Sequence, residues 1–271
     1  MAKEAKFFQV EIDGPVVIWR FNNPPRNLWN VETATEFDDL VEALYDDPDL
    51  RVGIITSAMP NVFIQHFDVS LLVEWGQALV DTPGELLVEP SPPRGVYRHG
   101  PKPVVAAINA PVAGGGCELT LACDFRFMSR AATIGQPEVL AGILPPIGTQ
   151  YMPRLIGIGK ALELLLIGRA VYADEAERIG LVTRACDPDQ LMPTALAFAK
   201  ELAARPPLAV ALIKRCIYEG SEMPLADGLA LAKELFAETI KSSEALEIMR
   251  AYVAMGQDPE RAREEIQQQQ Q

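Results

Sequence analysis

Hydrophobic residues recur with different periods along the chain, and the periods predict which segments are strands and which are helices. Residues 8–21 alternate between hydrophobic and polar around a Gly-Pro pair, which predicts a β-hairpin. Across 31–45 the hydrophobic residues are spaced three and four apart, as on one helix face, with Thr33 as a candidate cap and Glu36 three residues later. The apolar run 52–56 is typical of a buried strand. The chain therefore opens as strand, strand, helix, strand.

The middle of the chain continues this alternation of strands and helices. A helix is predicted over 69–80, and five prolines between residues 83 and 101 favour an irregular segment after it. Residues 102–109 form the next buried strand, and three consecutive glycines follow it. The elements predicted after the glycines are helix 117–123, strand 125–128 and strand 133–134.

From Leu155 onward the pattern is mainly helical, with one short strand at 181–182. The predicted helices are 159–167, 173–179, 189–204, 207–219, 224–239 and 242–254. After Asp258 the chain is charged and ends in five glutamines, so we expect a frayed tail. This order of elements indicates a layered α/β core followed by a helical region.

Composition and charge narrow the classes of function that such a fold can serve. The 271 residues are 49% hydrophobic and 23% charged, as in ordinary globular proteins. A net charge of −13 disfavours nucleic acid as a partner, because phosphate binding requires basic patches. We find neither a secretory signal nor a run of 18 apolar residues, so we expect a cytoplasmic protein that does not enter a membrane. Because there are only two histidines, and the four cysteines lack zinc-type spacing, we expect no metal site.

The glycines 114–116 lie between a predicted buried strand and a predicted helix. Glycine lets the backbone approach a ligand closely, and a helix N-terminus adds positive partial charge at the same place. Such a segment suits a carbonyl oxygen that becomes negative during a reaction. The spacing matches neither a GxxxxGK[ST] phosphate loop nor GxGxxG. A tight turn with close packing explains the glycines equally well.

Two glutamates follow the glycines and are candidates for acid–base chemistry. Glu118 falls in the first turn of the predicted helix, where a carboxylate also complements the helix dipole. Glu138 lies in the loop 135–138 next to an apolar run, which is expected to raise the pKa of its carboxyl group. A raised pKa suits a general acid or base. Each glutamate taken alone fits an ordinary surface role at least as well.

Residues 102–182 contain GGGCEL, then GQPE, then GTQ, and residues 23–27 read NPPRN. This combination resembles the enoyl-CoA hydratase/isomerase (crotonase) superfamily over nearly the whole chain. The resemblance implies an α/β fold in which a core built as a spiral of repeated ββα units, with the active site, spans residues 1–195. It also implies a C-terminal helical region over 196–271, with a frayed glutamine-rich tail, that forms a homotrimer or a dimer of trimers.

The resemblance further implies roles for individual residues. The backbone N–H groups of Gly115 and Phe67 would form an oxyanion hole for the thioester oxygen, and Glu118 and Glu138 would move protons to and from water. We assign Glu118 as the base and Glu138 as the acid, although the sequence alone does not order them. The other residues that would bind substrate are His66, Asp68, Gly114, Pro137, Arg26 and Phe236. Coenzyme A would be part of the substrate, so no separate cofactor is expected.

The chain departs from the family pattern around this site. Gln65, His66 and Phe67 replace small residues of an AGAD-like motif, so the pocket wall should differ. His66 would either be a third titrating group near the substrate or pack in a purely structural position. The loop 142–150 is one residue shorter than usual, and the resemblance places it beside Glu138.

Two further departures concern substrate binding. The C-terminal lysine segment that helps the family to bind the CoA phosphates is missing at 254–257, which leaves Arg26 and Lys102 as candidate positive charges. The segment 83–101 would form the acyl pocket.

These features favour an enoyl-CoA hydratase of fatty acid metabolism that adds water across the 2,3-double bond. The first alternative is another crotonase activity, either enoyl-CoA isomerase or acyl-CoA hydrolase/lyase. The second is a protein that binds acyl-CoA without turning it over.

Overall fold

The computed structural model describes residues 5–82 and 100–258. The chain divides into two compact units, Met1–Ala204 and Arg205–Gln271, which we describe separately. The division falls at the end of a helix, whereas the sequence analysis places it after residue 195, inside that helix. The predicted irregular segment before residue 102 lies almost wholly outside the described residues, and the predicted tail lies entirely outside them.

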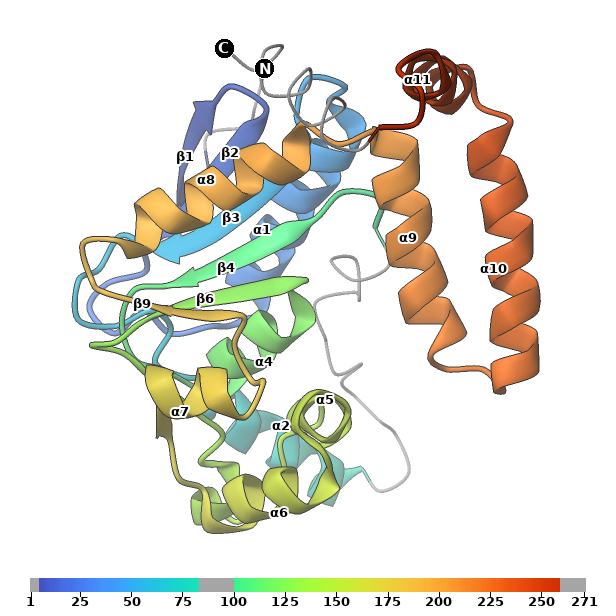
Figure 1. Cartoon of the computed structure of the whole chain (residues 1–271). Coiled ribbons are helices and arrows are strands. Elements are labelled where there is room, and N and C mark those ends of the chain that lie inside the picture. Colours follow the sequence, from blue (N-terminus) through green and yellow to red (C-terminus); the bar gives the residue numbers. More distant parts are fainter. Residues whose placement is uncertain (1–4, 83–99, 259–271) are drawn as a thin grey trace. The chain divides into compact units, whose positions relative to one another are not determined.

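Six strands form the main sheet of the first unit, and all neighbours in it are parallel except the first pair (Figure 1). In sheet order they are β1 (Phe8–Asp13), β2 (Val16–Phe21), β3 (Val52–Ser57), β4 (Val104–Ile108), β6 (Phe125–Ser129) and β9 (Arg184–Cys186). The central strands β3 and β4 are buried on both faces, as is usual for parallel strands covered by helices.

Two hydrophobic clusters cover the two faces of this sheet. On one face, Phe37 and Val41 of α1 (Val31–Asp46) are fully buried in the larger cluster. On the other face, Leu191 and Ala195 of α8 (Leu191–Ala203) belong to the smaller one. The predicted hairpin and the helix over 31–45 are therefore confirmed.

A smaller three-stranded sheet places both glutamate-bearing segments together. It consists of β5 (Val112–Ala113), β7 (Thr133–Gly135) and β8 (Val171–Tyr172). Strands β5 and β7 are parallel neighbours, so the chain leaves both at the same edge. Just beyond β5 lies α4 (Gly115–Ala122), and just beyond β7 lies the short 3-10 helix η1 (Glu138–Ala141). Glu118 and Glu138 consequently emerge side by side although 20 residues separate them.

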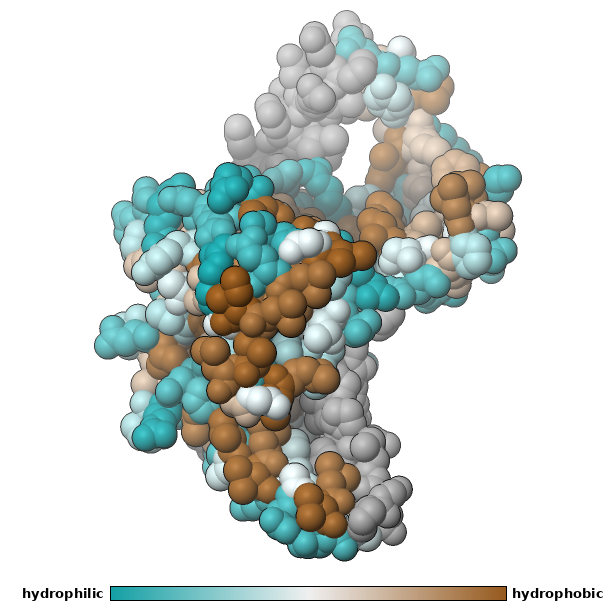
Figure 2. Space-filling view, turned by 90° about the horizontal axis from the view of Figure 1, so that it is seen from below, coloured by the Kyte–Doolittle hydropathy of each residue, from teal (hydrophilic) through white to brown (hydrophobic). Residues whose placement is uncertain are grey.

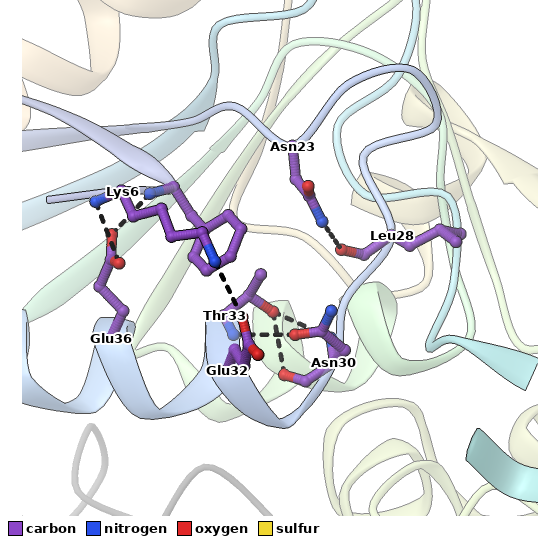
Figure 3. A network of polar contacts seen from close by, with 8 residues as sticks. Lys6, Asn23, Leu28, Asn30, Glu32, Thr33 and Glu36 are labelled. Atoms are coloured by element: carbon purple, nitrogen blue, oxygen red, sulfur yellow. Dashed lines mark hydrogen bonds and ion pairs between the residues drawn. The ribbon is translucent and has the colours of Figure 1, made fainter. Parts of the chain in front are cut away.

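The N-terminus of α1 differs from the sequence-based prediction. The N-cap is Asn30, whose side chain accepts from the Thr33 N–H at 2.9 Å, while the Thr33 hydroxyl accepts from the Asn30 N–H at 2.9 Å (Figure 3). Thr33 is therefore the third residue of the helix, and its prediction as the cap was wrong. Glu36 instead accepts from the N–H groups of Lys6 and Phe7, which secures the chain's entry into β1. Asn is among the strongest N-caps, which explains why Asn30 rather than Thr33 caps the helix.

The segment after Glu138 also differs from the prediction. A helix, α5 (Gly148–Ile156), precedes α6 (Ile158–Ile167), whereas the sequence pattern predicts no helix between residues 139 and 158. Pro145 and Pro146 lie directly before Ile147, the N-cap of α5, and proline is compatible with the region of a helix start, so the two prolines mark a boundary rather than a continuous loop.

The prediction of a short strand at 181–182 was wrong. The N–H groups of Leu181 and Val182 both donate to Ala176 O and close α7 (Ala173–Arg178), and the strand begins only at Arg184. The predicted helix over 69–80 is confirmed as α2 (Val69–Asp81).

The second unit contains the three predicted helices α9 (Pro207–Gly220), α10 (Leu225–Ile240) and α11 (Ser243–Ala254). The first two pack together near the turn that joins them, where a Cβ added to Gly228 would lie 3.1 Å from Gly220 O. Among the described helices, none is long and apolar enough to cross a membrane.

Apolar side chains are exposed on one face of the first unit, the face toward the viewer in Figure 2. They come from η1, the loop after it and α6, and they include Leu140, Leu144, Ile158, Leu162, Leu166 and Ile167. Leu140 is 75% exposed and lies only two residues beyond Glu138. A contiguous apolar surface of this kind is typical of regions that bind another protein.

Candidate active site

The loop 63–68 forms one wall of the site, and the turn after β2 holds it in place. Asn27 is fully buried, and its side-chain nitrogen donates to Phe63 O at 2.6 Å and to Ser57 Oγ at 3.0 Å. Trp29 N–H donates to His66 O at 2.9 Å, and Asp68 N–H donates to Trp29 O at 2.7 Å. The turn recognised as NPPRN thus acts as a support for this loop.

The other side of the loop is attached to β5. Ile64 forms a parallel bridge with Val112, and Ala113 N–H donates to Ile64 O at 3.2 Å. A Cβ added to Gly116 would lie 2.5 Å from the Ile64 side chain, so α4 begins directly against the loop. Only glycine permits this approach.

Two backbone N–H groups meet where the loop faces α4. The hydrogen bond from Trp29 to His66 O fixes the peptide group, and because that group is planar and trans, the N–H of Phe67 points away from Trp29. A Cβ added to Gly115 would lie 3.4 Å from Phe67 N and 3.0 Å from Phe67 Cβ, so the two residues are adjacent. Neither the Phe67 N–H nor the Gly115 N–H donates to an acceptor in the part of the chain that the structure describes.

Glu118 lies in the first turn of α4 and is held by the start of α5. Its Oε1 accepts from the N–H groups of Ile147 at 2.8 Å and Gly148 at 3.0 Å. Burial raises the pKa of Glu118 above its ordinary value, and these two hydrogen bonds offset only part of that rise. The loop that the resemblance places beside Glu138 therefore binds Glu118 and favours its ionised form.

Glu138 begins η1, and its carboxyl group has a different environment. Burial, the largest cause, and the negative charge of Glu118 together raise its pKa to about 7, although a hydrogen bond from its own backbone opposes the rise. The Gln136 side-chain amide is oriented so that its nitrogen faces this carboxyl group. The nitrogen then donates to Glu138 Oε1 at 2.9 Å and to Glu138 Oε2 at 3.0 Å. Gln136 is 1% exposed, so its position is fixed by packing.

The carboxyl groups and the loop share one small region. A Cβ added to Gly114 would lie 3.2 Å from Glu138 Oε1 and 3.2 Å from His66 Cβ. Cys117 of α4 is fully buried, and burial and the charges of both glutamates raise the pKa of its thiol. The Glu138 carboxyl group and the His66 side chain thus both lie close to the backbone at Gly114, next to the two backbone donors.

The remaining residues of the predicted site occupy varied positions. Asp68 caps α2 by accepting from Ser70 N–H at 3.0 Å and Ser70 Oγ at 2.6 Å, and these bonds lower its pKa. Pro137 caps η1 next to Glu138. Arg26 is exposed on the turn that supports the loop.

Two further candidates for CoA binding belong to other elements of the chain. The ammonium of Lys102 donates to Leu44 O at 2.8 Å and Asp47 O at 2.6 Å. It therefore holds the C-terminal end of α1, where cations complement the helix dipole, rather than offering a charge for phosphate. Phe236 lies on α10 in the second unit and is 64% exposed.

Within residues 5–82 and 100–258, no three His, Cys, Asp or Glu side chains gather in a way that could hold a metal ion.

Comparison with known proteins decides the family. The sequence model of the enoyl-CoA hydratase/isomerase family matches residues 11–259, which is most of the chain. The chain belongs to the enoyl-CoA hydratase/isomerase family. The sequence-based predictions of the family and of an enzyme of the crotonase superfamily are therefore confirmed.

Relatives and solved structures agree with this assignment. The short-chain-enoyl-CoA hydratase of Clostridium acetobutylicum is 34% identical over 90% of this chain and 93% of that protein. The crotonyl-CoA hydratase of Syntrophomonas wolfei is 33% identical over 90% of this chain and 94% of that protein. The crystal structure of an enoyl-CoA hydratase from Bacillus anthracis superposes with a TM-score of 0.81 at 29% identity, covering 92% of this chain and 97% of that one. The predicted fold class is confirmed.

Sequence reasoning missed several residues that build this family member's site. Asn27 and Trp29 fix the loop from a distance of more than 30 residues, and Gln136 pairs with Glu138. The buried polar character of Asn27 and Gln136 is invisible in the sequence. Their proximity to the NPPRN and GQPE motifs was the available signal.

Proposed function

We propose that this enzyme adds water across the 2,3-double bond of an enoyl-CoA thioester. The observation that carries the proposal is the pairing of Glu118 and Glu138, two carboxyl groups in different environments beside two unpaired backbone donors. The names of the relatives above point to the same reaction class.

The backbone donors suit the thioester oxygen. When water adds to the β-carbon, negative charge moves to this oxygen, and the N–H groups of Phe67 and Gly115 would stabilise it. One such donor contributes about 3–4 kcal/mol in a transition state. The role needs only backbone atoms at Phe67, so the bulky side chain there does not exclude it.

The two carboxyl groups suit opposite steps of proton transfer. Glu118 receives two N–H donors that favour its anion, so it is assigned as the base that takes a proton from water. Glu138, with a pKa of about 7, holds a proton in part of the population at neutral pH and is assigned as the acid for the α-carbon. Oxygen then bonds the β-carbon and hydrogen the α-carbon, and exchange with solvent restores both carboxyl groups.

Crotonyl-CoA turnover tests the proposal. Loss of the conjugated absorbance reports hydration, and Glu118→Gln and Glu138→Gln should each lower kcat by about 100-fold or more. Glu177→Gln, on the exposed side of α7, is the matched control and should leave kcat unchanged. Wild-type turnover in either active-site variant would refute the mechanism. Conversion of a 3-enoyl-CoA without hydration would indicate the isomerase, and CoA binding without turnover the inactive binder; either would replace the proposal.

We also propose that the enzyme assembles as a homotrimer or a dimer of trimers. The exposed apolar surface on η1 and α6 supports assembly, because single chains rarely leave such a surface in water. Sedimentation equilibrium should give a mass of three or six chains, and Leu166→Glu should lower it. A single-chain mass for the wild type would refute assembly.

Arg26 is proposed to contact the phosphates of CoA, since its guanidinium is exposed on the turn that supports the oxyanion loop. Arg26→Gln should raise KM for crotonyl-CoA several-fold without lowering kcat. An unchanged KM would remove this role.

A further inference from the structure

His66 has a defined hydrogen-bonding state. Its Nδ1 lies 2.6 Å from Phe67 O. A carbonyl oxygen only accepts hydrogen bonds, so Nδ1 carries the proton and donates it. In the neutral ring the lone pair is then on Nε2. Among the described residues, Nε2 has no hydrogen-bond partner.

The His66 side chain is part of the site rather than of the outer surface. Its Cβ lies 3.2 Å from the Cβ position of Gly114, which in turn is 3.2 Å from Glu138 Oε1. Only the Cα and the carbonyl carbon of His66 separate this Cβ from Phe67 N, one of the two unpaired donors. His66 is partly buried, so its side chain contacts other residues and is also accessible to water.

We propose that this site also hydrolyses the thioester bond of saturated acyl-CoA, with His66 as the general base. The inference rests on the acyl-CoA binding proposed above but not on hydration. The thioester oxygen would occupy the same place between Phe67 N–H and Gly115 N–H. The carbonyl carbon would then lie within a few ångströms of the His66 ring, because a hydrogen-bonded oxygen is about 3 Å from its donor.

The reaction is balanced without any further reagent. Nε2 of His66 takes a proton from water, and the water oxygen bonds the carbonyl carbon. The resulting tetrahedral oxyanion is held by the two N–H groups. When the carbon–sulfur bond breaks, the thiolate leaves with the proton from the imidazolium. The products are a carboxylic acid and free CoA thiol, and His66 returns to its neutral form.

The geometry favours His66 over the glutamates for this step. Glu118 is held by two N–H groups at the start of α5, whereas His66 belongs to the same loop as an oxyanion donor. Phe67 would serve twice, since its C=O orients the base and its N–H binds the oxyanion. A base oriented by a second group in this manner is the general arrangement for activating a nucleophile.

Butyryl-CoA separates the two activities because it has no double bond to hydrate. Release of free thiol from butyryl-CoA would be followed with a thiol-reactive chromophore, and crotonyl-CoA hydration would be measured in parallel on the same preparations. The key variant is His66→Asn, whose amide nitrogen keeps a donor for Phe67 O but has no counterpart of Nε2. His66→Ala removes both, and Glu177→Gln is the control for both activities.

We expect thiol release by the wild type, and a loss of about 100-fold or more in both His66 variants, in line with general base catalysis. The ratio of hydrolysis to hydration should fall by a similar factor in His66→Asn. Thiol release no faster than without protein, or at the wild-type rate in His66→Asn, would overturn the proposal. An equal fall of both activities would also overturn it, because His66 would then only position the loop. Loss of hydration alone would count against the hydratase and not against His66.

Discussion

Replacing Glu138 by glutamine should change how stability depends on pH, because burial raises the pKa of this carboxyl group to about 7 from 4.5. Between these two values the unfolded chain loses the proton while the folded chain keeps it, so the wild type loses stability as pH rises through this window. Glutamine is neutral at every pH and nearly the same shape. The variant should therefore match the wild type below pH 4.5 and be more stable above pH 7.

The size of the effect follows from the shift. At about 1.4 kcal/mol per pH unit, the full shift corresponds to about 3 kcal/mol. The carboxyl is only partly buried, so solvent screens part of this. The Gln136 amide, which donates to both oxygens, also favours the anion and opposes the shift. We therefore expect Glu138→Gln to stabilise the folded state by about 1–2 kcal/mol at pH 8.

Urea denaturation at pH 4 and pH 8, at one fixed protein concentration, measures this difference. Glu74→Gln, on the exposed surface of α2, controls for removing a negative charge and should show no such pH dependence. If Glu138→Gln is less stable than the wild type at pH 8, the carboxylate is stabilised by its surroundings, and the assignment of Glu138 as the acid loses its basis.

Three further substitutions test the structure around the site. Gly116→Ala places a methyl group against the Ile64 side chain and should lower the free energy of unfolding by about 1–3 kcal/mol. An unchanged free energy of unfolding would mean that the loop 63–68 can shift without strain. Asn27→Ala removes three side-chain hydrogen bonds, two of them fully buried, at a residue with φ of 54°, so it should cost about 2–4 kcal/mol and lower kcat, and a change below about 1 kcal/mol would contradict the support role. Lys102→Met should cost about 1–2 kcal/mol by freeing carbonyls at the end of α1, with KM for crotonyl-CoA unchanged, whereas a raised KM would restore Lys102 to CoA binding.

The sequence predicts those parts of the fold in which the pattern is local. The hairpin at 8–21 and the helix at 31–45 are visible as periods of two and of three to four residues. The glycines before α4 also carry a local signal, because no other residue fits so close to the neighbouring loop. Most element types were thus predictable, and their order indicated an α/β core.

Contacts between distant residues were not predictable in this way. Thr33 was the wrong cap because Asn30, three residues earlier, competes better, and Glu36 accepts hydrogen bonds from the backbone just before the first strand. The positive charge of Lys102 could bind a phosphate or the C-terminal end of a helix. Only the fold shows that its ammonium binds the carbonyls at the end of α1. The individual roles of the site residues depend on such contacts, so they stay predictions to be tested by substitution.

The position of the unusual residues in the loop has a physical explanation. At Phe67 the proposed chemistry uses the backbone N–H, which every residue except proline supplies, so the side chain is free to vary. At Gly115 the same chemistry disfavours a side chain, because a Cβ there would lie 3.0 Å from Phe67 Cβ and narrow the space between the donors. His66 departs from the small residue at a point where the peptide group is already fixed by Trp29. The loop can therefore acquire a new side-chain function at His66 while its backbone continues to serve the thioester oxygen.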